Sequence, residues 1–148
     1  MYSHILVPTD GSTLSLKAAR AGAELAKKLR AKMTAVYVIP QFQPDYAGEG
    51  LYFSSATQKK DYLAGMQAMA EKALTRIVSA AREAGVKCDS TSVVSESPWE
   101  GIIGAARKLK CDMIVMSSHG RGGIAGVVLG SQTNRVLTHS KIPVLVCR

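Results

Sequence analysis

The stretch HILVPTDGST, residues 4–13, sets the pattern that the rest of the chain repeats. Its apolar run ILV ends at Pro8, and a short apolar run closed by a proline is typical of a buried strand. A turn with several helix-capping residues follows. From Thr13 to Arg30, small and apolar residues recur at steps of three and four, as they do on one face of a helix. The stretch therefore predicts a strand, a tight turn and a helix in immediate succession.

The same alternation continues to the end of the chain. The strands are nearly continuous apolar runs, which is expected when helices cover both faces of a parallel sheet. Connections between parallel strands are right-handed, so the pattern predicts an open, doubly wound, five-stranded parallel α/β sheet. Further strands are expected at residues 33–39, 86–95, 113–116 and 143–146, with helices at 58–84, 98–110 and 131–139 and a long loop at 40–57.

Signals for helix ends support these boundaries. The tetrapeptide SPWE at residues 97–100 has a capping residue, a proline and a glutamate at the spacing of a capping box. Ser131 is expected to cap the last helix. Gly85 is suited to the left-handed position that follows a helix end.

Length and composition limit the class of protein. The chain has 148 residues, 47% of them hydrophobic and 20% charged, with a formal net charge of +8. These values are typical of one globular domain, here residues 1–148, and exclude a disordered or low-complexity chain. No apolar run is long enough to cross a membrane, and the N-terminus lacks a signal peptide's pattern, so we expect a cytoplasmic protein with no membrane partner. Cys88, Cys111 and Cys147 lie far apart and predict neither disulfides nor a zinc site.

A glycine-rich segment follows the fourth expected strand. Five glycines lie between Ser117 and Ser131, and no Asp or Glu occurs from Met113 to Arg148. Glycines let backbone N–H groups approach an anion closely, and the N-terminus of a following helix adds a favourable dipole. Ligands bind such sheets at the carboxyl ends of the strands, so the segment predicts a phosphate site. A flexible surface connection is the simpler alternative.

Other phosphate-binding and nucleic-acid-binding patterns fit poorly. The P-loop motif is absent, and the partial dinucleotide fingerprint Gly120-x-Gly122-x-x-Ala125 lacks an acidic residue about 20 positions later. Asp10 and Lys141 resemble part of a phospho-acceptor receiver domain, but the acidic cluster and acceptor aspartate of that class are missing. Aromatic residues in the 40–57 loop beside a basic surface are weak evidence for a nucleic-acid partner, so none is expected.

Two polar residues near the strand ends each have two interpretations. Asp10 would hold a ribose hydroxyl or a magnesium ion, or it would cap the first helix, an interaction worth about 1 kcal/mol. His119 would contact phosphate or act as an acid, or it would be a solvated loop residue, which is the more common role.

Three motifs together resemble the universal stress protein family. They are ILVPTDGS at residues 5–12, SSHG at 117–120 followed nine residues later by Gly130-Ser131, and PVLV at 143–146. They occur in the family's order and span the chain.

The nucleotide pattern of that family is G-x-x-G-x9-G-[ST]. Gly120, Gly130 and Ser131 match it with the required nine residues between the two glycines, whereas Ser117 occupies the position of the first glycine. A serine is small and retains its backbone N–H, so the resemblance still implies the ATP-binding branch of the family.

The resemblance implies an adenine nucleotide α-hydrolase-like fold with strand order 3-2-1-4-5. It implies ATP, alone or with magnesium, as the ligand. The residues after the first strand would line the adenosine, the residue on the second strand would pack near the base, and those at the last helix would hold the phosphates. The implied nucleotide-binding residues are Pro8, Thr9, Asp10, Val38, Met116, Ser117, Gly120, Gly130, Ser131 and Gln132.

The resemblance also implies a stress-response sensor or regulator that forms a homodimer through its C-terminal strand and acts on a protein partner that the sequence does not identify. Phosphoryl transfer needs a positioned nucleophile, and no acid or glutamine is clearly placed to orient a water. We therefore assign no catalytic residue. A dimeric stress-response partner that binds no nucleotide and a slow ATPase stay open as alternatives.

Overall fold

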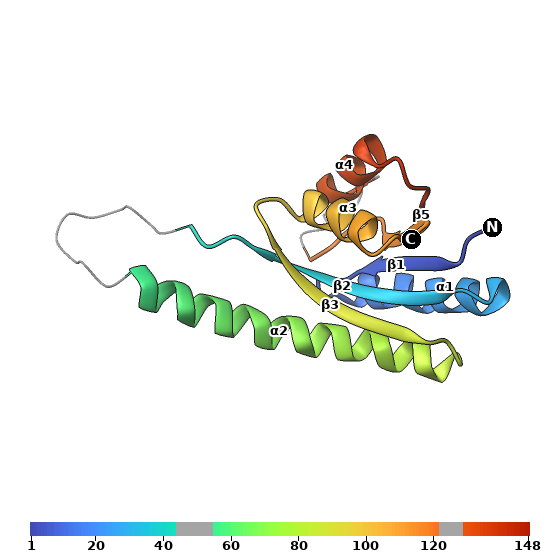
Figure 1. Ribbon diagram of the computed structural model, residues 1–148, viewed down its shortest axis with the longest axis horizontal. Helices are drawn as coiled ribbons and strands as arrows, with labels where there is room; N and C mark the ends of the chain where they lie inside the picture. Colours follow the sequence, from blue (N-terminus) through green and yellow to red (C-terminus); the bar gives the residue numbers. More distant parts are fainter. Residues whose placement is uncertain (44–54, 122–128) are drawn as a thin grey trace.

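The computed structural model describes residues 1–43, 55–121 and 129–148. Strands and helices alternate along the described chain (Figure 1). Their bounds are β1 (His4–Pro8), α1 (Thr13–Leu29), β2 (Lys32–Pro40), α2 (Ser55–Glu83), β3 (Cys88–Ser95), α3 (Pro98–Lys108), β4 (Met113–Ser117), α4 (Ser131–His139) and β5 (Val144–Cys147). Helix α2 begins three residues before the expected start, and part of the 40–57 loop, residues 44–54, lies outside the described residues.

The five strands form one parallel sheet in the order β3-β2-β1-β4-β5, as predicted. Strand β1 is central, and Ile5 lies opposite Met33 of β2 and Met113 of β4. Every residue of β1 is buried, which explains its unbroken apolar run. The strand order runs outward in both directions from the β1–β4 pair, so the connections that follow β1 and β4 lead to helices on opposite faces of the sheet, α1 and α4. A crevice forms between two such connections at the carboxyl ends of the strands.

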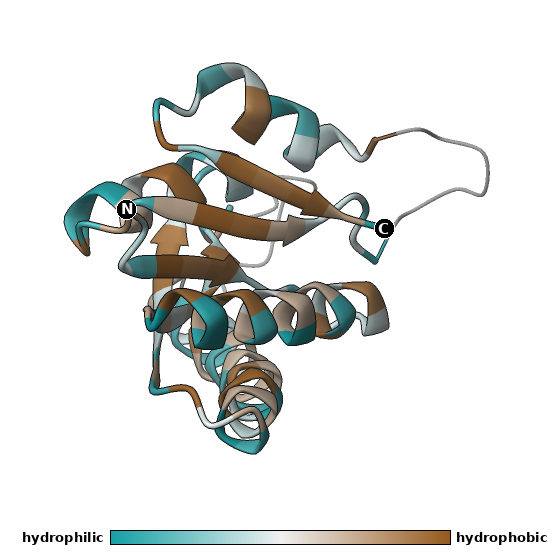
Figure 2. Cartoon of the chain, turned by 90° about the vertical axis from the view of Figure 1, so that its right-hand side faces the viewer, coloured by the Kyte–Doolittle hydropathy of each residue, from teal (hydrophilic) through white to brown (hydrophobic). Residues whose placement is uncertain are grey.

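Helices cover both faces of the sheet, and the apolar core lies in two layers. Ile5 and Val7 pack with α1 and α2 on one face, whereas Leu6 packs with α3 and α4 on the other. Successive side chains of a strand point to opposite faces, so one short strand supplies both layers. The hydropathy colouring of Figure 2 shows apolar strands between helices with mixed surfaces.

The helix ends match the sequence signals only in part. Gly85 has φ +76°, and the N–H groups of Gly85 and Val86 donate to the carbonyls of Arg82 and Ala81 at 2.9 Å each, which confirms the predicted C-terminal motif of α2. The capping box predicted at α3 is wrong, because the Ser97 side chain makes no capping bond.

The predicted capping role of Ser131 is also wrong, because Gly130 is the N-cap of α4 and Ser131 is its first residue. At α3, Gln132 takes the role expected of Ser97. Its side-chain oxygen accepts a 3.1 Å hydrogen bond from the Trp99 N–H, which satisfies one donor of the first turn of α3. This bond joins the N-terminal turns of α3 and α4.

Two findings bear on the expectations from composition. In the described part of the chain, no helix has the length and hydropathy that a bilayer crossing requires. The three cysteines are free thiols, of which Cys111 is buried and the other two are partly exposed. Burial raises the pKa of Cys88 and of Cys111 to about 11, so both thiols stay protonated at neutral pH.

Candidate functional site

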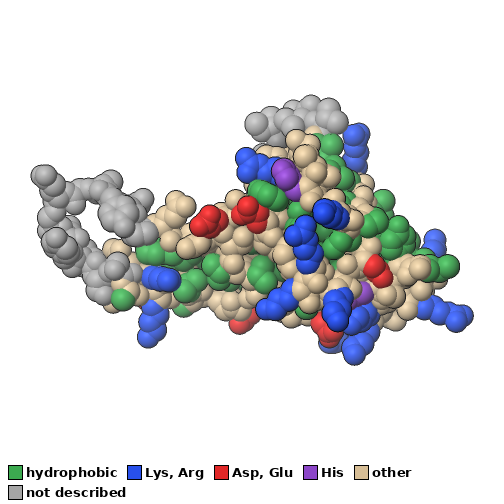
Figure 3. All heavy atoms as spheres, turned by 45° about the horizontal axis from the view of Figure 1, so that its top comes forward, with side chains coloured by type: hydrophobic (Ala, Val, Ile, Leu, Met, Phe, Trp, Pro, Cys, Tyr) green, Lys and Arg blue, Asp and Glu red, His purple; other side chains and the backbone are tan. Residues whose placement is uncertain are grey.

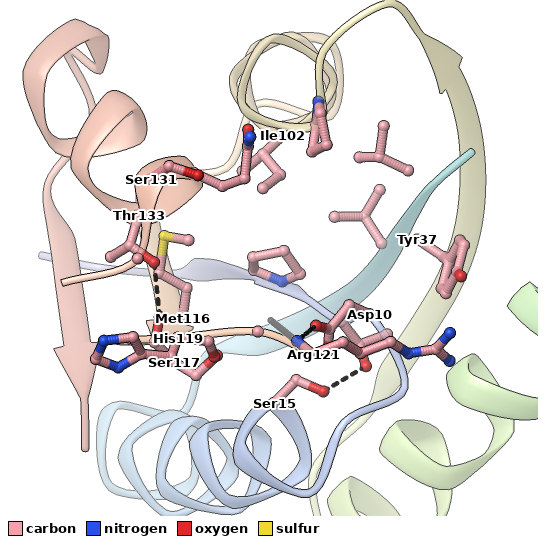
Figure 4. A pocket seen from close by; sticks show the side chains of 18 of the residues that line it. Asp10, Ser15, Tyr37, Ile102, Met116, Ser117, His119, Arg121, Ser131 and Thr133 are labelled. Atoms are coloured by element: carbon pink, nitrogen blue, oxygen red, sulfur yellow. Dashed lines mark hydrogen bonds between the residues drawn. The ribbon is translucent and has the colours of Figure 1, made fainter. Parts of the chain in front are cut away.

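A cavity of about 610 Å³ lies at the carboxyl ends of β1, β2 and β4 (Figure 4). Its volume falls in the range of about 300–1,000 Å³ that is usual for small-molecule sites. Parallel strands joined by helices place the helix N-termini at the same edge of the sheet, so residues from the first turns of α1, α3 and α4 also line the cavity. These residues are Ser15, Pro98 and Ser131.

One part of the cavity wall is apolar. Pro8 ends β1, Val38 lies near the end of β2, and Met116 lies near the end of β4, while Met66 of α2 and Ile102 of α3 complete the surface. These side chains present carbon and sulfur atoms without charge, so this part of the wall suits a flat, apolar or heterocyclic group.

The edge of β2 adds backbone polar groups to this wall. The Thr9 N–H donates to the Val36 carbonyl at 2.9 Å, so the backbone groups of Val36 face β1. Backbone direction alternates along a strand, and the groups of Val38 therefore point to the same side. Strand β1 ends at Pro8, opposite Val36, so no residue of β1 pairs with Val38. The N–H and the carbonyl of Val38, one donor and one acceptor, thus face the region beyond the end of β1.

The N-terminus of α4 forms a second, polar part of the wall. The Gly130 N–H donates to the Ser118 carbonyl at 2.8 Å, which fixes the approach of the chain to the helix. The next three N–H groups, those of Ser131, Gln132 and Thr133, belong to the first turn, whose donors point out of the helix end. Together with the helix dipole they favour an anion.

Asp10 joins the loop after β1 to the loop after β4. Its Oδ1 accepts from the Ser12 N–H at 2.9 Å, and its Oδ2 accepts from the Arg121 N–H at 2.7 Å. A Cβ on Gly120 would overlap that Oδ2, so the approach requires glycine. Burial raises the pKa of Asp10, but the hydrogen bonds from Ser12 and Arg121 outweigh it, and the pKa lies below its ordinary value. Asp10 is therefore charged at neutral pH.

The helix-capping interpretation of Asp10 is wrong, because Ser12 caps α1. The Ser12 hydroxyl accepts from the Ser15 N–H at 3.1 Å. The Ser15 hydroxyl in turn contacts the Thr9 hydroxyl at 2.9 Å, and Thr9 accepts from the Gly11 N–H at 3.1 Å. Gly11 has φ +82°, a conformation that favours glycine. These bonds fix the loop at the end of β1, and none of them involves the carboxylate of Asp10.

Ser117, at the position of the missing motif glycine, directs its hydroxyl toward its own chain. The Ser117 Oγ donates to the His119 carbonyl at 2.7 Å, and the Ser117 carbonyl accepts from the Thr133 hydroxyl at 2.9 Å. The first bond forms the turn that leads into the glycine-rich segment. The second joins β4 to the first turn of α4, so Thr133 helps to position that helix end.

His119 is not the solvated loop residue favoured above. Its Nδ1 lies 3.1 Å from the Ser118 hydroxyl, and its Nε2 is buried without a hydrogen-bond partner among the described residues. His119 also lines the cavity. The other two histidines have structural contacts: His4 contacts the Thr34 hydroxyl at 2.8 Å, and His139 stacks on Trp99 with ring centres 4.6 Å apart.

The structure brings all ten of the predicted site residues to this one cavity. They are Pro8, Thr9, Asp10, Val38, Met116, Ser117, Gly120, Gly130, Ser131 and Gln132. The side chains of Gln132 and Ser117 bond within the protein, as described above. Whether the ten residues bind a nucleotide stays a prediction.

Sequence reasoning missed other residues of the wall. Tyr37 directly precedes Val38 near the end of an expected strand, and this closeness to the strand end could have identified it as a residue of the site. Met66 and Ile102 lie on helix faces whose sequence pattern predicts core residues. Only the packing of the helices shows that these two side chains also line the cavity. Within the described ranges, no group of three His, Cys, Asp or Glu residues could hold a metal ion by itself.

Comparisons with known proteins agree with this architecture. The sequence model of the universal stress protein family matches residues 1–148. The universal stress protein MJ0531 of Methanocaldococcus jannaschii is 33% identical over 151 aligned residues, which cover 100% of this chain and 83% of that protein.

Two solved structures are similar over nearly the whole chain. One is the hypothetical protein MJ0577, whose biochemical function was assigned from its structure. Its TM-score is 0.81 and its identity 28%, with 99% of this chain and 95% of that chain covered. A universal stress protein in complex with cAMP has a TM-score of 0.68 and 26% identity, with 99% and 97% covered. The match of the family model over the whole sequence is the decisive finding: this chain belongs to the universal stress protein family.

Proposed function

We propose that this chain binds an adenine nucleotide in the cavity at the strand ends, with ATP as the ligand, and that it acts as a stress-response regulator. One observation carries the proposal. An apolar wall suited to a base and a helix N-terminus suited to phosphate, α4, line the same cavity. The related protein solved with cAMP, at 26% identity, supports an adenine nucleotide as the class of ligand.

The base would lie against Pro8, Val38 and Ile102. The Watson–Crick edge of adenine has a donor, the exocyclic amine, beside an acceptor, N1. The backbone of Val38 offers the complementary pair beyond the end of β1. Guanine has a carbonyl and a ring N–H at the same positions, so it would meet this pair in the wrong polarity, and we expect a preference for adenine.

The phosphates would lie at the N–H groups of Ser131, Gln132 and Thr133. Asp10 would lie beside the sugar, because a carboxylate accepts hydrogen bonds from hydroxyls and repels phosphate. Magnesium usually takes one or two carboxylates and completes its shell with phosphate oxygens and water. Asp10 fits such a partial role, since each of its oxygens has a lone pair beyond the bonds to Ser12 and Arg121.

We propose no efficient catalysis. The site offers charge stabilisation at α4, but the carboxylate of Asp10 already accepts bonds from two loops, and no second acid lines the cavity among the described residues. Slow ATP hydrolysis and a nucleotide-free regulatory role are the two alternatives. A cytoplasmic location and an unidentified protein partner belong to this proposal as well.

Two measurements test it. Mass spectrometry of ligand released from freshly purified protein should detect an adenine nucleotide. Calorimetry should show binding of ATP with magnesium and much weaker binding of GTP. No released nucleotide together with no heat of binding would favour the nucleotide-free alternative. Turnover that Asp10→Asn abolishes would favour the ATPase.

A further inference from the structure

We infer that a second anion subsite adjoins the cavity on its α2 side. It is formed by Arg121, which lines the cavity, and by Arg76, which lies outside the lining and bonds to the neighbouring loop residue Gly11. The ligand that this subsite suits is an adenine nucleotide with a second phosphate on its ribose. This inference rests on the proposed nucleotide function. It specifies a further group of the ligand, the second phosphate, which neither the family match nor the similar structures indicate.

The two guanidinium groups converge on the loop that follows β1. The Arg76 Nη1 donates to the Gly11 carbonyl at 3.1 Å. A Cβ placed on Gly11 would lie 2.8 Å from the Arg121 Nη2 and 3.5 Å from the Cβ of Ala73 on α2. The Arg121 guanidinium and α2 therefore both lie close to the side of Gly11 where a side chain would project, and Arg76 contacts the carbonyl of the same residue.

Neither guanidinium is neutralised by the protein. In the described ranges, no carboxylate forms an ion pair with Arg76 or Arg121, and both side chains are exposed at the surface. Asp10 accepts from the backbone N–H of Arg121 and not from its side chain. Each guanidinium has five N–H donors, of which Arg76 uses one for Gly11. Two like charges with unused donors at one loop favour an anion of high charge, and phosphate fits the fork of a guanidinium.

This pair lies away from the proposed phosphate position at α4. In Figure 4, Ser131 and the side chain of Arg121 lie on opposite sides of the cavity, with Asp10 between them. The two anion-favouring ends are thus separated by a carboxylate, which in the absence of a metal ion repels phosphate and accepts hydrogen bonds from hydroxyl groups. A sugar beside Asp10, with one phosphate toward α4 and another toward the arginines, satisfies all three positions. Nucleoside bisphosphates with a 5′-phosphate and a 2′- or 3′-phosphate have this arrangement.

The test compares three ligands on the full-length protein. Calorimetry gives the affinities of AMP, adenosine 3′,5′-bisphosphate and adenosine 2′,5′-bisphosphate for the wild type. We expect at least one bisphosphate to bind about tenfold more tightly than AMP, as a charge-assisted pair of hydrogen bonds allows. The affinity ratio of that bisphosphate to AMP should fall toward one in Arg76→Gln and in Arg121→Gln.

Arg82→Gln is the matched control. Arg82 is also an exposed arginine of α2, but it lines a separate groove against β3 and does not contact Gly11. Its substitution removes the same charge and should leave the affinity ratio as in the wild type. Thermal unfolding of each variant verifies that the fold is retained.

The outcomes separate this inference from the proposed function. If AMP binds and neither bisphosphate binds more tightly, or if the ratio is unchanged in both arginine variants, the second subsite is refuted while the nucleotide site stands. An equal fall of the ratio in Arg82→Gln also refutes it, because overall charge would then explain the preference. If none of the three ligands binds, the proposed function itself fails, and this inference fails with it.

Discussion

The carboxylate of Asp10 and the backbone N–H of Arg121 form a 2.7 Å hydrogen bond between residues 111 positions apart. The bond links the two loops that flank the crevice, since Asp10 follows β1 and Arg121 follows β4. Gly120 makes it possible, because any side chain at that position would overlap the carboxylate. The loop that would bind a ligand is thus positioned by the sheet through one charged hydrogen bond.

Replacement of Asp10 by Asn should destabilise the protein by about 1–3 kcal/mol, the usual cost of leaving a partner of a charged hydrogen bond unpaired. The amide retains one acceptor oxygen, so only one of the Ser12 and Arg121 N–H groups keeps its partner. Denaturant unfolding at neutral pH measures the loss. Glu24→Gln, an exposed carboxylate on α1, is the control and should change stability little. Equal stability of Asp10→Asn and wild type would contradict this role.

The pH dependence of that loss has a defined sign. The pKa of Asp10 is lower in the folded protein than its ordinary value of 3.8, so the carboxylate stabilises the fold above pH 3.8. The contribution is lost as the pH falls from 3.8 through the folded pKa. We therefore expect the stability difference between wild type and Asp10→Asn to be constant near neutral pH and to shrink below pH 3.8. A difference that grows on acidification would show that another group controls it.

Gly130→Val should lower the affinity for ATP by more than about tenfold, the effect of a 1.4 kcal/mol loss. A Cβ on Gly130 would lie 3.1 Å from the Ser118 carbonyl and 3.4 Å from the His119 Cα. The added side chain therefore presses on the loop before it, displaces the Gly130 N–H from its bond to Ser118 and shifts the first turn of α4. Calorimetry measures the affinity.

Gly104→Val is the control for that substitution. Gly104 lies on the exposed face of α3, and a Cβ there would meet no atom within 4 Å. It should lower helix stability slightly and leave the affinity for ATP unchanged. Equal affinities of Gly130→Val and wild type would place the phosphates away from α4.

Most of the fold follows from local patterns, whereas part of the site depends on long-range contacts. The apolar runs, Gly85 and the alternation of strands and helices predict the elements and their class. The capping of α3 does not follow from its own residues. The Ser97 side chain accepts no hydrogen bond from the N–H groups of the first turn of α3, and Gln132 of α4 supplies the acceptor for one of them. Likewise, Met66 joins the cavity only because α2 packs across the end of β2. No periodicity in one segment encodes such contacts.

The two roles available to Gln132 can be separated by two substitutions. Gln132→Ala removes the acceptor for the Trp99 N–H and should cost about 1 kcal/mol of stability, as the loss of a helix cap does. Gln132→Glu retains an acceptor, and its negative charge is favourable at two helix N-termini, so it should preserve stability. The same charge would repel phosphates at α4, and Gln132→Glu should weaken ATP binding more than Gln132→Ala. Unfolding and calorimetry on both variants give the result, and the reverse order of affinities would refute the proposed phosphate position.

The last prediction concerns a homodimer through β5, which is an edge of the sheet. The Pro143 carbonyl accepts from the Ile114 N–H, and the Cys147 carbonyl accepts from the Ser118 N–H, so odd-numbered residues of β5 direct their backbone groups toward β4. The backbone groups of Val144 and Val146 therefore point to the outer edge.

An exposed strand edge with apolar residues invites pairing with a second chain, and an antiparallel pair about a two-fold axis closes the assembly at two copies. Val146→Pro removes an N–H from the outer edge only, and proline is tolerated on edge strands. It should convert a dimer into a monomer with little loss of thermal stability. Leu145→Pro removes an N–H that faces β4, so it should lower the stability of the fold itself. Light scattering and thermal unfolding distinguish the two. A monomeric wild type at micromolar concentrations, or a Val146→Pro variant that stays dimeric, would exclude this edge as the interface.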